Sequence, residues 1–282
     1  MKKITIAGVP EHFNFPWHFA IDEGAFEQNG IEVEWIDIPE GTGKMCQLLR
    51  EGFIDLAVIL TEGIVKDITN GNPSKIVQKY IASPLLWGIH VDKNSDHQQI
   101  TDLEGKTAAI SRYGSGSHLM AYINASQQGW DTASLNFEVV NTIDGAITAL
   151  KNGTADYFMW EHFTTKPLVD NGTFRRIADC PTPWPCFVIA ANNEFIKTNR
   201  ALISYILSII NSYTSEFKNI PSIDRTLANA YHQDIYDIKK WLSITKWSQN
   251  QIESDTILQV QEQLFRLNLI DKKVAASTFI SN

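Results

Sequence analysis

The sequence predicts an α/β protein made of two similar α/β lobes. Three observations lead to this prediction: apolar strands alternate with helices up to about residue 190, the alternation restarts near residue 107, and one short pattern occurs twice. Strands that alternate with helices are typical of βαβ units around a mainly parallel sheet. The composition agrees with a folded chain, because 44% of the 282 residues are hydrophobic and only 20% are charged.

The first series of elements spans residues 4–81. Residues 4–7 form a short apolar strand, and Pro16 and Asn29-Gly30 suit the start and the end of a helix over 17–28. Strict alternation of apolar and polar side chains predicts a half-buried strand over 31–35. A helix over 44–50 that stops at Gly52, a buried strand over 56–60, a helix over 64–69 and a strand over 75–81 complete the series.

The second series begins with a strand over residues 107–110. A helix over 119–128, a strand over 137–140 and a helix over 146–150 follow, and then come strands over 157–160, 175–178 and 187–190. The rest of the chain is expected to be helical, with apolar residues at helical spacing along 202–213 and 257–267. We interpret these two apolar stripes as packing faces.

The repeated pattern relates two connections between a helix and a strand. Residues 49–55 read Leu-Arg-Glu-Gly-Phe-Ile-Asp, and residues 150–156 read Leu-Lys-Asn-Gly-Thr-Ala-Asp. In both copies the glycine is expected to end a helix in the left-handed conformation, and the aspartate opens an apolar strand. Each strand then runs into an acid, Glu62 in the first copy and Glu161 in the second. The repeat favours two lobes of similar build.

The same reasoning indicates where a ligand would bind. In an open α/β sheet, ligands bind beyond the carboxyl ends of the strands. This rule selects the loops at 12–15, 39–43 and 61–62 in the first lobe, and those at 111–117 and 160–162 in the second. If the two lobes face each other, these loops converge on one cleft.

Several of these segments resemble ABC-transporter solute-binding proteins. Residues 15–26 (FPWHFAIDEGAF) and the Gly-Ile-Glu-Val run at 30–33 are similar to the family's first helix and the strand after it. Residues 102–111 (DLEGKTAAIS) are similar to the entry into the family's second lobe, and residues 153–156 to its G-x-x-D-A segment. The branch that the sequence most resembles binds sulfonates, nitrate or the pyrimidine precursor of thiamine. The resemblance spans roughly residues 4–190.

The resemblance implies the type II periplasmic-binding-protein fold, in which two lobes close on a ligand between them. It implies a first lobe formed by residues 1–88 and by 188–282, whose C-terminal helices pack on it, and a second lobe formed by 89–187. The chain would cross between the lobes near residues 87–90 and 187–189. Two features depart from the family pattern: no secretion leader precedes residue 4, and the cysteine cluster of the fungal pyrimidine-synthesising relatives is absent. The sequence as it stands therefore indicates a cytoplasmic protein, or a periplasmic or lipid-anchored one if a leader was removed.

The sharpest candidate binding motif is Ser-Arg-Tyr-Gly-Ser-Gly-Ser-His at residues 111–118. It follows a strand and opens a helix, so unpaired backbone N–H groups and the positive helix end would point at a ligand. It lacks the third glycine of a dinucleotide fingerprint and the Gly-Lys-Ser/Thr of a phosphate loop, and the alternative is an ordinary helix cap with the arginine on the surface. The contacts expected from this motif, and from its weaker counterpart in the first lobe, are Ser111, Arg112, Tyr113, Gly114, Ser115, Gly116, Ser117, Gly41 and Thr42.

Acids, histidines and aromatic residues supply the other candidates. Glu62 and Glu161 are expected to accept hydrogen bonds from an amine or an aminopyrimidine, the alternative being solvated or ion-paired acids. His12 and His162 are candidate donors across the cleft. The density of aromatic side chains favours a flat organic ligand over a bare inorganic anion. The remaining predicted ligand contacts are Phe13, Asn14, Thr61, Trp87, Trp160 and Trp184.

Several other classes of function lack support in the sequence. The formal net charge of −8 argues against nucleic acid as a partner, since binding phosphates requires a basic face. No apolar run reaches the ~18 residues of a membrane span, so direct membrane insertion is not expected. No His-x-x-x-His or Cys-x-x-Cys spacing indicates a metal, no cofactor is expected, and no Gly-x-Ser-x-Gly elbow indicates a nucleophile, so no catalytic residue is assigned.

The predicted function is solute binding in an ABC-type uptake system, with an ABC permease as the partner protein. The ligand is expected to be a small organic molecule, heteroaromatic or sulfonate-like, which is bound by hinge closure and is not converted. The alternative is a cytoplasmic enzyme on the same fold, acting in thiamine-pyrimidine or menaquinone-type biosynthesis. The effector domain of a regulator is less favoured, because no helix-turn-helix precedes residue 4.

Overall fold

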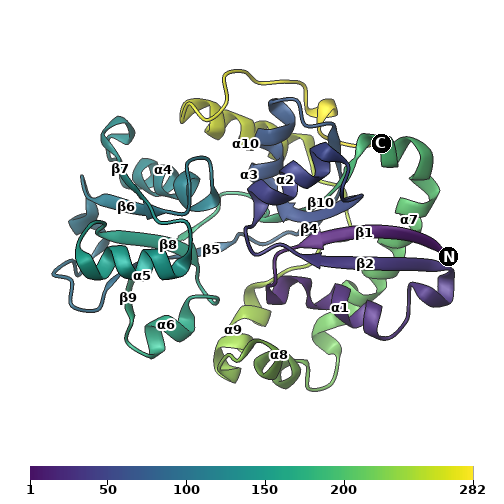
Figure 1. Ribbon diagram of the computed structural model, residues 1–282, viewed down its shortest axis with the longest axis horizontal. Coiled ribbons are helices and arrows are strands. Elements are labelled where there is room, and N and C mark those ends of the chain that lie inside the picture. Colours follow the sequence, from purple (N-terminus) through teal and green to yellow (C-terminus); the bar gives the residue numbers. More distant parts are fainter. Residues whose placement is uncertain (282) are drawn as a thin grey trace. The chain divides into compact units, whose positions relative to one another are not determined.

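The computed structural model describes residues 1–281, which divide into two compact units (Figure 1). The first unit comprises Met1–Ser83 and Trp184–Asn282, and the second comprises Pro84–Pro183. The first unit is thus assembled from both ends of the chain, whereas the second is continuous in sequence.

The first unit contains a mixed five-stranded sheet. Its strands are β1 (Lys2–Gly8), β2 (Ile31–Asp37), β3 (Leu56–Leu60), β4 (Ser74–Ile81) and β10 (Phe187–Asn192), in the order β2-β1-β3-β10-β4. The pairs β1–β2 and β1–β3 are parallel, and β10 runs antiparallel to β3 and β4. All six residues of β10 are buried, which suits a strand with neighbours on both sides. The α/β class predicted from the sequence is confirmed.

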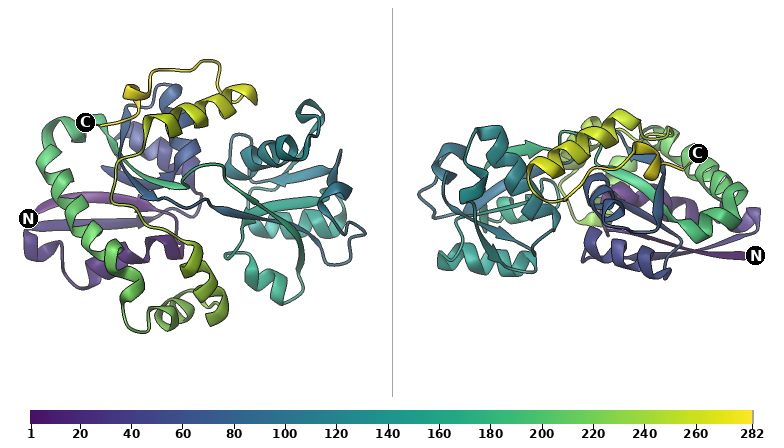
Figure 2. Two further views of the ribbon diagram at one scale, coloured as in Figure 1. Left: turned by 180° about the vertical axis from the view of Figure 1, so that it is seen from behind. Right: turned by 90° about the horizontal axis from the view of Figure 1, so that it is seen from above.

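Helices cover this sheet and extend along the C-terminal part of the chain. They are α1 (Phe15–Asp22), α2 (Thr42–Glu51), α3 (Thr61–Thr69), α7 (Asn193–Glu216), α8 (Ile223–Tyr231), α9 (Ile235–Ile244) and α10 (Ser254–Arg266), with 3-10 turns at His12–Asn14, Glu27–Asn29, Phe217–Asn219 and Ala276–Thr278. The long helix α7 packs against α1, β4 and β10, and Figure 2 shows it (green) running across the strands of this unit. The predicted helix over 17–28 is wrong in its extent: α1 ends at Asp22, because the chain turns at Gly24 with a left-handed φ of 70°.

The last part of the chain covers the edge strand β4. Backbone N–H groups of Lys79 and Ala82 donate to the carbonyls of Asn250 and Lys246, and Ser248 donates to the carbonyl of Tyr80, over 2.7–3.0 Å. The Lys79 ammonium also lies 2.5 Å from a carboxylate oxygen of Glu253. The backbone groups on the outer side of this edge strand thereby find hydrogen-bond partners within the same chain.

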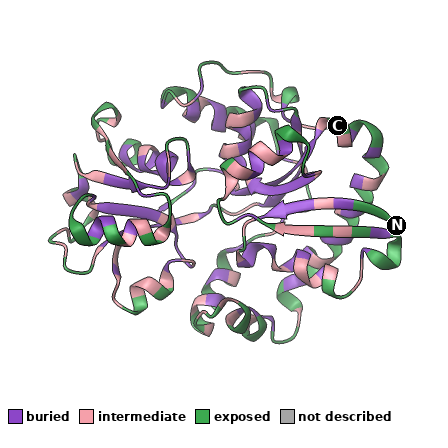
Figure 3. Ribbon diagram, viewed as in Figure 1, coloured by how far each residue is buried: buried purple, intermediate pink, exposed green. Residues whose placement is uncertain are grey.

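The second unit repeats the architecture of the first. Its strands β5 (Leu86–Asp92), β6 (Thr107–Ile110), β7 (Asn136–Val139), β8 (Tyr157–Glu161) and β9 (Phe174–Pro181) form a sheet of order β7-β6-β8-β5-β9. The helices are α4 (Gly116–Gln128), α5 (Ile143–Asn152) and α6 (Lys166–Asp170), with 3-10 turns at Ile100–Leu103 and Thr132–Ser134. In both sheets the fourth strand in the spatial order, β10 or β5, runs antiparallel to the three strands before it, which are parallel to one another. Figure 3 shows that the strands at the centre of each sheet are mostly buried.

The sequence repeat corresponds to the same local structure in both units. Gly52 ends α2 and Gly153 ends α5, each with a φ of 72°. Asp55 Oδ2 accepts a hydrogen bond from the Thr5 amide at 2.9 Å, and Asp156 Oδ2 accepts one from the Thr107 amide at 2.8 Å. The amide of each aspartate returns a hydrogen bond to the carbonyl of the same threonine. The repeated aspartate therefore holds the first parallel strand of each unit beside the third.

The two capping glycines give a direct stability test. Gly52→Ala and Gly153→Ala are each expected to lower the free energy of unfolding by about 1 kcal/mol, because a Cβ is disfavoured at a positive φ. Gly43→Ala, inside α2, is the control and should be neutral or stabilising, since alanine has the higher helix propensity. Urea denaturation measures all three. Equal stability of the three variants would contradict the proposed role of the two caps.

The chain passes between the units at two adjacent segments. It leaves the first unit between Ser83 and Pro84 and returns between Pro183 and Trp184. Within the second unit, Leu85 and Thr182 exchange hydrogen bonds of 2.9 Å. The residues at 87–90 and 187–189, expected to form the crossings, lie within β5 and β10.

Candidate ligand-binding site

The predicted contacts of the first unit gather at one edge of its sheet. Because β1, β2 and β3 are parallel neighbours, the residues that follow them lie at the same edge. β10 is antiparallel to β3, so the residue Trp184 that precedes it lies at this edge too. The predicted residues brought to this edge are His12, Phe13 and Asn14 after β1, Gly41 and Thr42 after β2, Thr61 and Glu62 after β3, and Trp184.

The N-termini of two helices meet at this edge. Gly63 lies in the first turn of α3, and a Cβ there would lie 2.1 Å from Cγ2 of Thr42, the first residue of α2. Only glycine allows the two helix ends to approach so closely. Gly41, the N-cap of α2, has a φ of 76° and a ψ of −159°, a conformation that also favours glycine. The edge thus carries the positive ends of two helices.

Glu62 is the most unusual residue of this edge. Its side chain is 1% exposed, and its Oε2 accepts a hydrogen bond of 2.8 Å from the indole Nε1–H of Trp184. Its Oε1 has no hydrogen-bond partner among the described residues. Burial raises the pKa of Glu62 from 4.5 to about 7, although the backbone amide and Trp184 oppose this effect by donating to the carboxylate. The carboxyl group is therefore close to half ionised at neutral pH.

Thr61 fixes the position of Trp184 beside Glu62. The Thr61 amide donates to the carbonyl of Cys186 at 3.0 Å, and its hydroxyl donates to the carbonyl of Pro185 at 2.6 Å. Thr61 is fully buried. The Thr61 hydroxyl proton is donated within the unit, so Thr61 holds the 184–186 segment in place. Contact between Thr61 and a ligand stays a prediction.

The residues after β1 pack in the interior of the first unit. The His12 ring stacks on the Trp241 ring with centroids 4.1 Å apart, and Phe13 contacts Trp241 and Phe187. Burial lowers the pKa of His12 to about 3, so the ring is neutral. Asn14 Nδ2 donates to the carbonyl of Val9 at 2.8 Å, and its Oδ1 has no partner among the described residues.

The predicted contacts of the second unit gather at the equivalent edge of its sheet. β6 and β8 are parallel, and β5 is antiparallel to β8 with Trp87 paired to Glu161. The residues brought to this edge are Ser111, Arg112, Tyr113, Gly114, Ser115, Gly116 and Ser117 after β6, Trp160, Glu161 and His162 at the end of β8, and Trp87 near the start of β5.

The serine motif forms a compact loop at the start of α4. Ser115 is the N-cap and accepts from the His118 amide at 3.3 Å. Ser117 Oγ accepts from the Ser111 amide at 3.0 Å and lies 3.1 Å from Ser115 Oγ. Gly114 adopts a φ of 79°, and Tyr113 is 66% exposed. The hydroxyls thus hold the loop together, and Tyr113 and Gly114 are its exposed residues.

Two tryptophans lie at the same edge. The rings of Trp87 and Trp160 meet edge to face with centroids 6.3 Å apart, and Trp160 also stacks on Phe158. Trp87 is 5% exposed, and its Nε1–H has no hydrogen-bond partner among the described residues. The second unit therefore presents a buried donor, whereas the first presents a buried acceptor.

Glu161 is not the structural equivalent of Glu62. Counted from the repeated aspartates, Glu62 corresponds to Phe163, and Glu161 corresponds to Leu60. Glu161 is the last residue of β8, and its Oε2 accepts hydrogen bonds from the amide and the hydroxyl of Thr164 at 2.6 and 2.8 Å. Burial raises its pKa, and the Thr164 hydrogen bonds oppose this. The parallel that the sequence suggested between the two acids is wrong by two positions.

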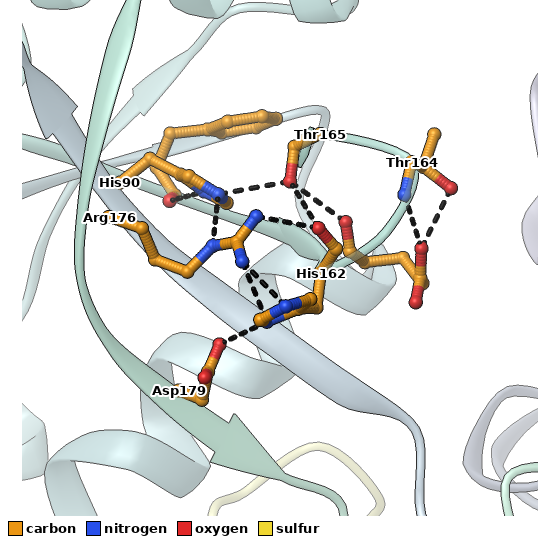
Figure 4. Close-up of polar contacts among 8 residues, drawn as sticks. His90, His162, Thr164, Thr165, Arg176 and Asp179 are labelled. Atoms are coloured by element: carbon orange, nitrogen blue, oxygen red, sulfur yellow. Dashed lines mark hydrogen bonds and ion pairs between the residues drawn. The ribbon is translucent and has the colours of Figure 1, made fainter. Parts of the chain in front are cut away.

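A polar cluster around Arg176 supports this edge, and His162 is the one member of it that the sequence indicated (Figure 4). Arg176 on β9 donates from Nη2 to the carbonyl of His162 at 2.7 Å and from Nε to His90 Nε2 at 3.3 Å. Its Nη1 lies 2.6 Å from His162 Nε2, and His162 Nδ1 lies 2.7 Å from Asp179 Oδ1. Thr165 Oγ1 lies 2.9 Å from His90 Nε2. The arginine therefore fastens the turn after β8 to the two neighbouring strands.

The hydrogen bonds assign the protons of this cluster. The Phe158 carbonyl, 3.2 Å from His90 Nδ1, can only accept, so Nδ1 carries the proton and Nε2 accepts from Arg176. Burial, followed by the charge of Arg176, lowers the pKa of His90 to about 3. Gly88 makes room for the pair, since a Cβ there would lie 2.6 Å from His90 Cε1 and 2.9 Å from Arg176 Nε.

Two further observations concern other kinds of site. Within residues 1–281, no group of three or more His, Cys, Asp or Glu side chains is arranged to hold a metal ion. No helix in the same part of the chain combines the length and apolarity needed to cross a membrane.

The fold and the two edges define a class of protein. Two α/β units, each with an antiparallel strand beside three parallel strands and with helix N-termini at one edge, are the architecture of the type II periplasmic-binding-protein fold. The model of the Ca3427-like PBP family matches residues 87–180 of this chain. The resemblance to ABC-transporter solute-binding proteins, which the sequence motifs predicted, is confirmed.

Individual relatives agree with this class. A Bacillus subtilis protein described as a "putative aliphatic sulfonates-binding protein" is 24% identical over 272 residues, which are 92% of this chain and 79% of that protein. The structure of the Candida albicans CA3427 gene product matches with a TM-score of 0.90 and 24% identity, covering 100% of this chain and 96% of the other. The alkanesulfonate-binding protein SsuA of Xanthomonas axonopodis pv. citri, bound to MOPS, matches with a TM-score of 0.83 and 15% identity over 100% of this chain and 98% of its own.

Proposed function

We propose that this chain binds a small organic solute at the two strand edges described above, and that its two units close on that solute. In this proposal it serves as the solute-binding component of an ABC-type uptake system, with a permease as partner. The relatives that bind sulfonates support the class of function.

One observation carries the proposal within this chain. Each unit places a buried hydrogen-bonding group at its predicted ligand edge, Oε1 of Glu62 in the first and Nε1 of Trp87 in the second, and neither group has a partner among the described residues. A buried polar group without a partner costs about 1–3 kcal/mol. Such groups are expected where a ligand satisfies them.

Ligand binding should stabilise the chain and make it more compact. A hundredfold excess of ligand over the dissociation constant is expected to add ~2.7 kcal/mol to the free energy of unfolding. Closure of the two units should lower the radius of gyration measured by small-angle X-ray scattering. A thermal-shift screen of aminopyrimidines, sulfonates and aromatic acids identifies the ligand to be used.

Trp87→Phe tests the site in the same assay. The variant keeps an aromatic ring and loses the Nε1–H donor, so we expect about tenfold weaker ligand binding. Trp17→Phe is the matched control, because its Nε1 is likewise buried without a partner among the described residues but its ring stacks on Phe26, which is not a predicted ligand contact. Equal affinity of both variants, or no compaction with ligand, would count against the proposed function.

A further inference from the structure

We propose that protonation of the His162 imidazole displaces Arg176 and thereby loosens the turn at 161–165, so that His162, Arg176 and Asp179 form an acid-sensitive latch in the second unit. The inference goes beyond the proposed function, because it concerns one unit of the unliganded chain. It starts from the arrangement drawn in Figure 4, where the His162 ring lies between a carboxylate and a guanidinium.

The carboxylate of Asp179 decides which nitrogen of His162 carries the proton. His162 is 5% exposed, and its Nδ1 lies 2.7 Å from Asp179 Oδ1. Burial acts to raise the pKa of Asp179, but the hydrogen bond to His162 and the charge of Arg176 hold it below its ordinary value of 3.8. An ionised carboxylate can only accept hydrogen bonds, so Nδ1 carries the proton and Nε2 of the neutral ring is the acceptor.

The Arg176 guanidinium lies against the nitrogen that would take up the second proton. Its Nη1 is 2.6 Å from Nε2 and 2.9 Å from Nδ1 of His162. A neutral ring accepts a hydrogen bond in this position. An imidazolium has an N–H on both nitrogens and no acceptor, and its charge would lie in contact with a second positive charge. Protonation therefore replaces a hydrogen bond by the repulsion of two cations.

The same guanidinium links the turn to the neighbouring strand β5. Nη2 of Arg176 donates to the His162 carbonyl at 2.7 Å, and Nε donates to His90 Nε2 at 3.3 Å. Thr165 Oγ1 lies 2.9 Å from the same nitrogen of His90. Displacement of the guanidinium thus removes the donor to the backbone of the turn and the bridge from Arg176 to β5 together.

The second histidine of the cluster stays neutral. Imidazoles are the side chains that ordinarily gain charge between pH 5 and pH 8. Burial, followed by the charge of Arg176, lowers the pKa of His90 to about 3, so His90 remains an acceptor throughout this range. His162 is therefore the imidazole of this cluster on which the proposal depends.

The other charged groups around the turn favour a proton on His162. Asp179 lies on β9, and Glu161 precedes His162 on β8. Burial raises the pKa of Glu161, and the hydrogen bonds to its carboxylate and the nearby His162 oppose this. On α6, the Lys166 ammonium lies 2.5 Å from a carboxylate oxygen of Asp170. The two carboxylates attract an imidazolium, so the guanidinium is the group that must move.

Hydrogen exchange of individual backbone amides, measured by NMR, tests the latch. Protection factors, which correct for the intrinsic pH dependence of exchange, are obtained at pH 8 and pH 5 without ligand. The reporters are the amides of Thr165 and Lys166, which donate to the carbonyls of Glu161 and Phe163 within the turn. The amide of Ile89 in β5 is the internal reference.

The variants separate His162 from the other titrating groups. His162→Gln keeps an acceptor and a donor but does not titrate. His97→Gln is the matched control, because His97 Nε2 lies 3.4 Å from Asp156 Oδ1 in the same unit, away from the turn. Glu161→Gln removes the carboxylate at the turn and keeps the histidine. Arg176→Met removes the guanidinium.

We expect the protection of Thr165 and Lys166 to fall about tenfold from pH 8 to pH 5 in the unsubstituted chain, His97→Gln and Glu161→Gln, because the turn loses its hydrogen bonds from the arginine. His162→Gln should keep its protection at pH 5. Arg176→Met should show low protection at both pH values. Long-range ¹H–¹⁵N spectra of the unsubstituted chain should show the His162 proton on Nδ1 at pH 8.

Several results would overturn the inference. Equal protection at pH 8 and pH 5 in the unsubstituted chain would show that the turn is not acid-sensitive. A pH response that persists in His162→Gln, or that disappears in Glu161→Gln or His97→Gln, would assign the effect to another group. A neutral His162 ring with its proton on Nε2 would contradict the latch even if a variant failed to fold. None of these results bears on solute binding, since no ligand is present.

Discussion

Replacing Glu62 by glutamine is expected to stabilise the unliganded chain by ~3 kcal/mol at pH 8 and to change its stability little at pH 4. The folded chain raises the pKa of this carboxyl from 4.5 to about 7, so the folded state binds the proton more tightly than the unfolded state. Stability is therefore highest below pH 4.5, falls as the pH rises towards 7, and levels off above that value. Glutamine carries no titrating proton and removes this part of the pH dependence.

Urea unfolding between pH 4 and pH 8 measures the effect. Glu32 is an exposed residue of β2, so Glu32→Gln is the control that makes the same change of charge away from the ligand edge. The unsubstituted chain and Glu32→Gln should lose stability in parallel across this range, and the curve of Glu62→Gln should diverge from both above pH 5. Divergence of the same size in Glu32→Gln would assign the effect to net charge and contradict the role of Glu62.

Arg176→Met is expected to lower the free energy of unfolding by about 3 kcal/mol. The substitution keeps the unbranched apolar stem and removes the donors to the His162 carbonyl, to His162 Nε2 and to His90 Nε2. Each buried acceptor left without its donor costs about 1–3 kcal/mol. The turn at 161–165 should also exchange its amide hydrogens faster, because it loses its link to β9.

Two variants complete this test. Arg176→Lys can restore a single donor and should fall between Arg176→Met and the unsubstituted chain. Lys166→Met removes a cation from the same unit whose partner Asp170 is exposed, and it should change stability by less than about 0.5 kcal/mol. Unchanged exchange at 161–165 in Arg176→Met would show that the arginine does not hold this turn.

The sequence predicts the fold well because its signals are local. Alternating apolar residues, helix-ending glycines such as Gly52 and Gly153, and the repeated aspartates each specify structure within a few residues. The strand-end rule then selects both edges without knowledge of the packing. The one clear error of extent, the helix over 17–28, arose because the turn at Gly24 lies inside an otherwise helical pattern.

The contacts within the site depend on residues far apart in the chain. Thr61 bonds to Pro185, which lies 124 positions away, only because β10 enters the sheet beside β3. His12 becomes an interior ring because α9 brings Trp241 against it. Arg176 reaches His90 through the pairing of β9 with β5, which no local pattern encodes. Sequence periodicity identifies strands, but it does not say which strands become neighbours.

The interleaved connectivity has a consequence for the growing chain on the ribosome. The second unit is complete in sequence once Pro183 has been synthesised. The first sheet has its opening four strands much earlier, yet β3 and β4 do not pair with each other and must await β10, which lies between them. Until residue 192 emerges, β3, which leads into the turn of α3 that carries Glu62, lacks one neighbour. The half of the ligand edge that begins first during synthesis is thus the half that is completed last.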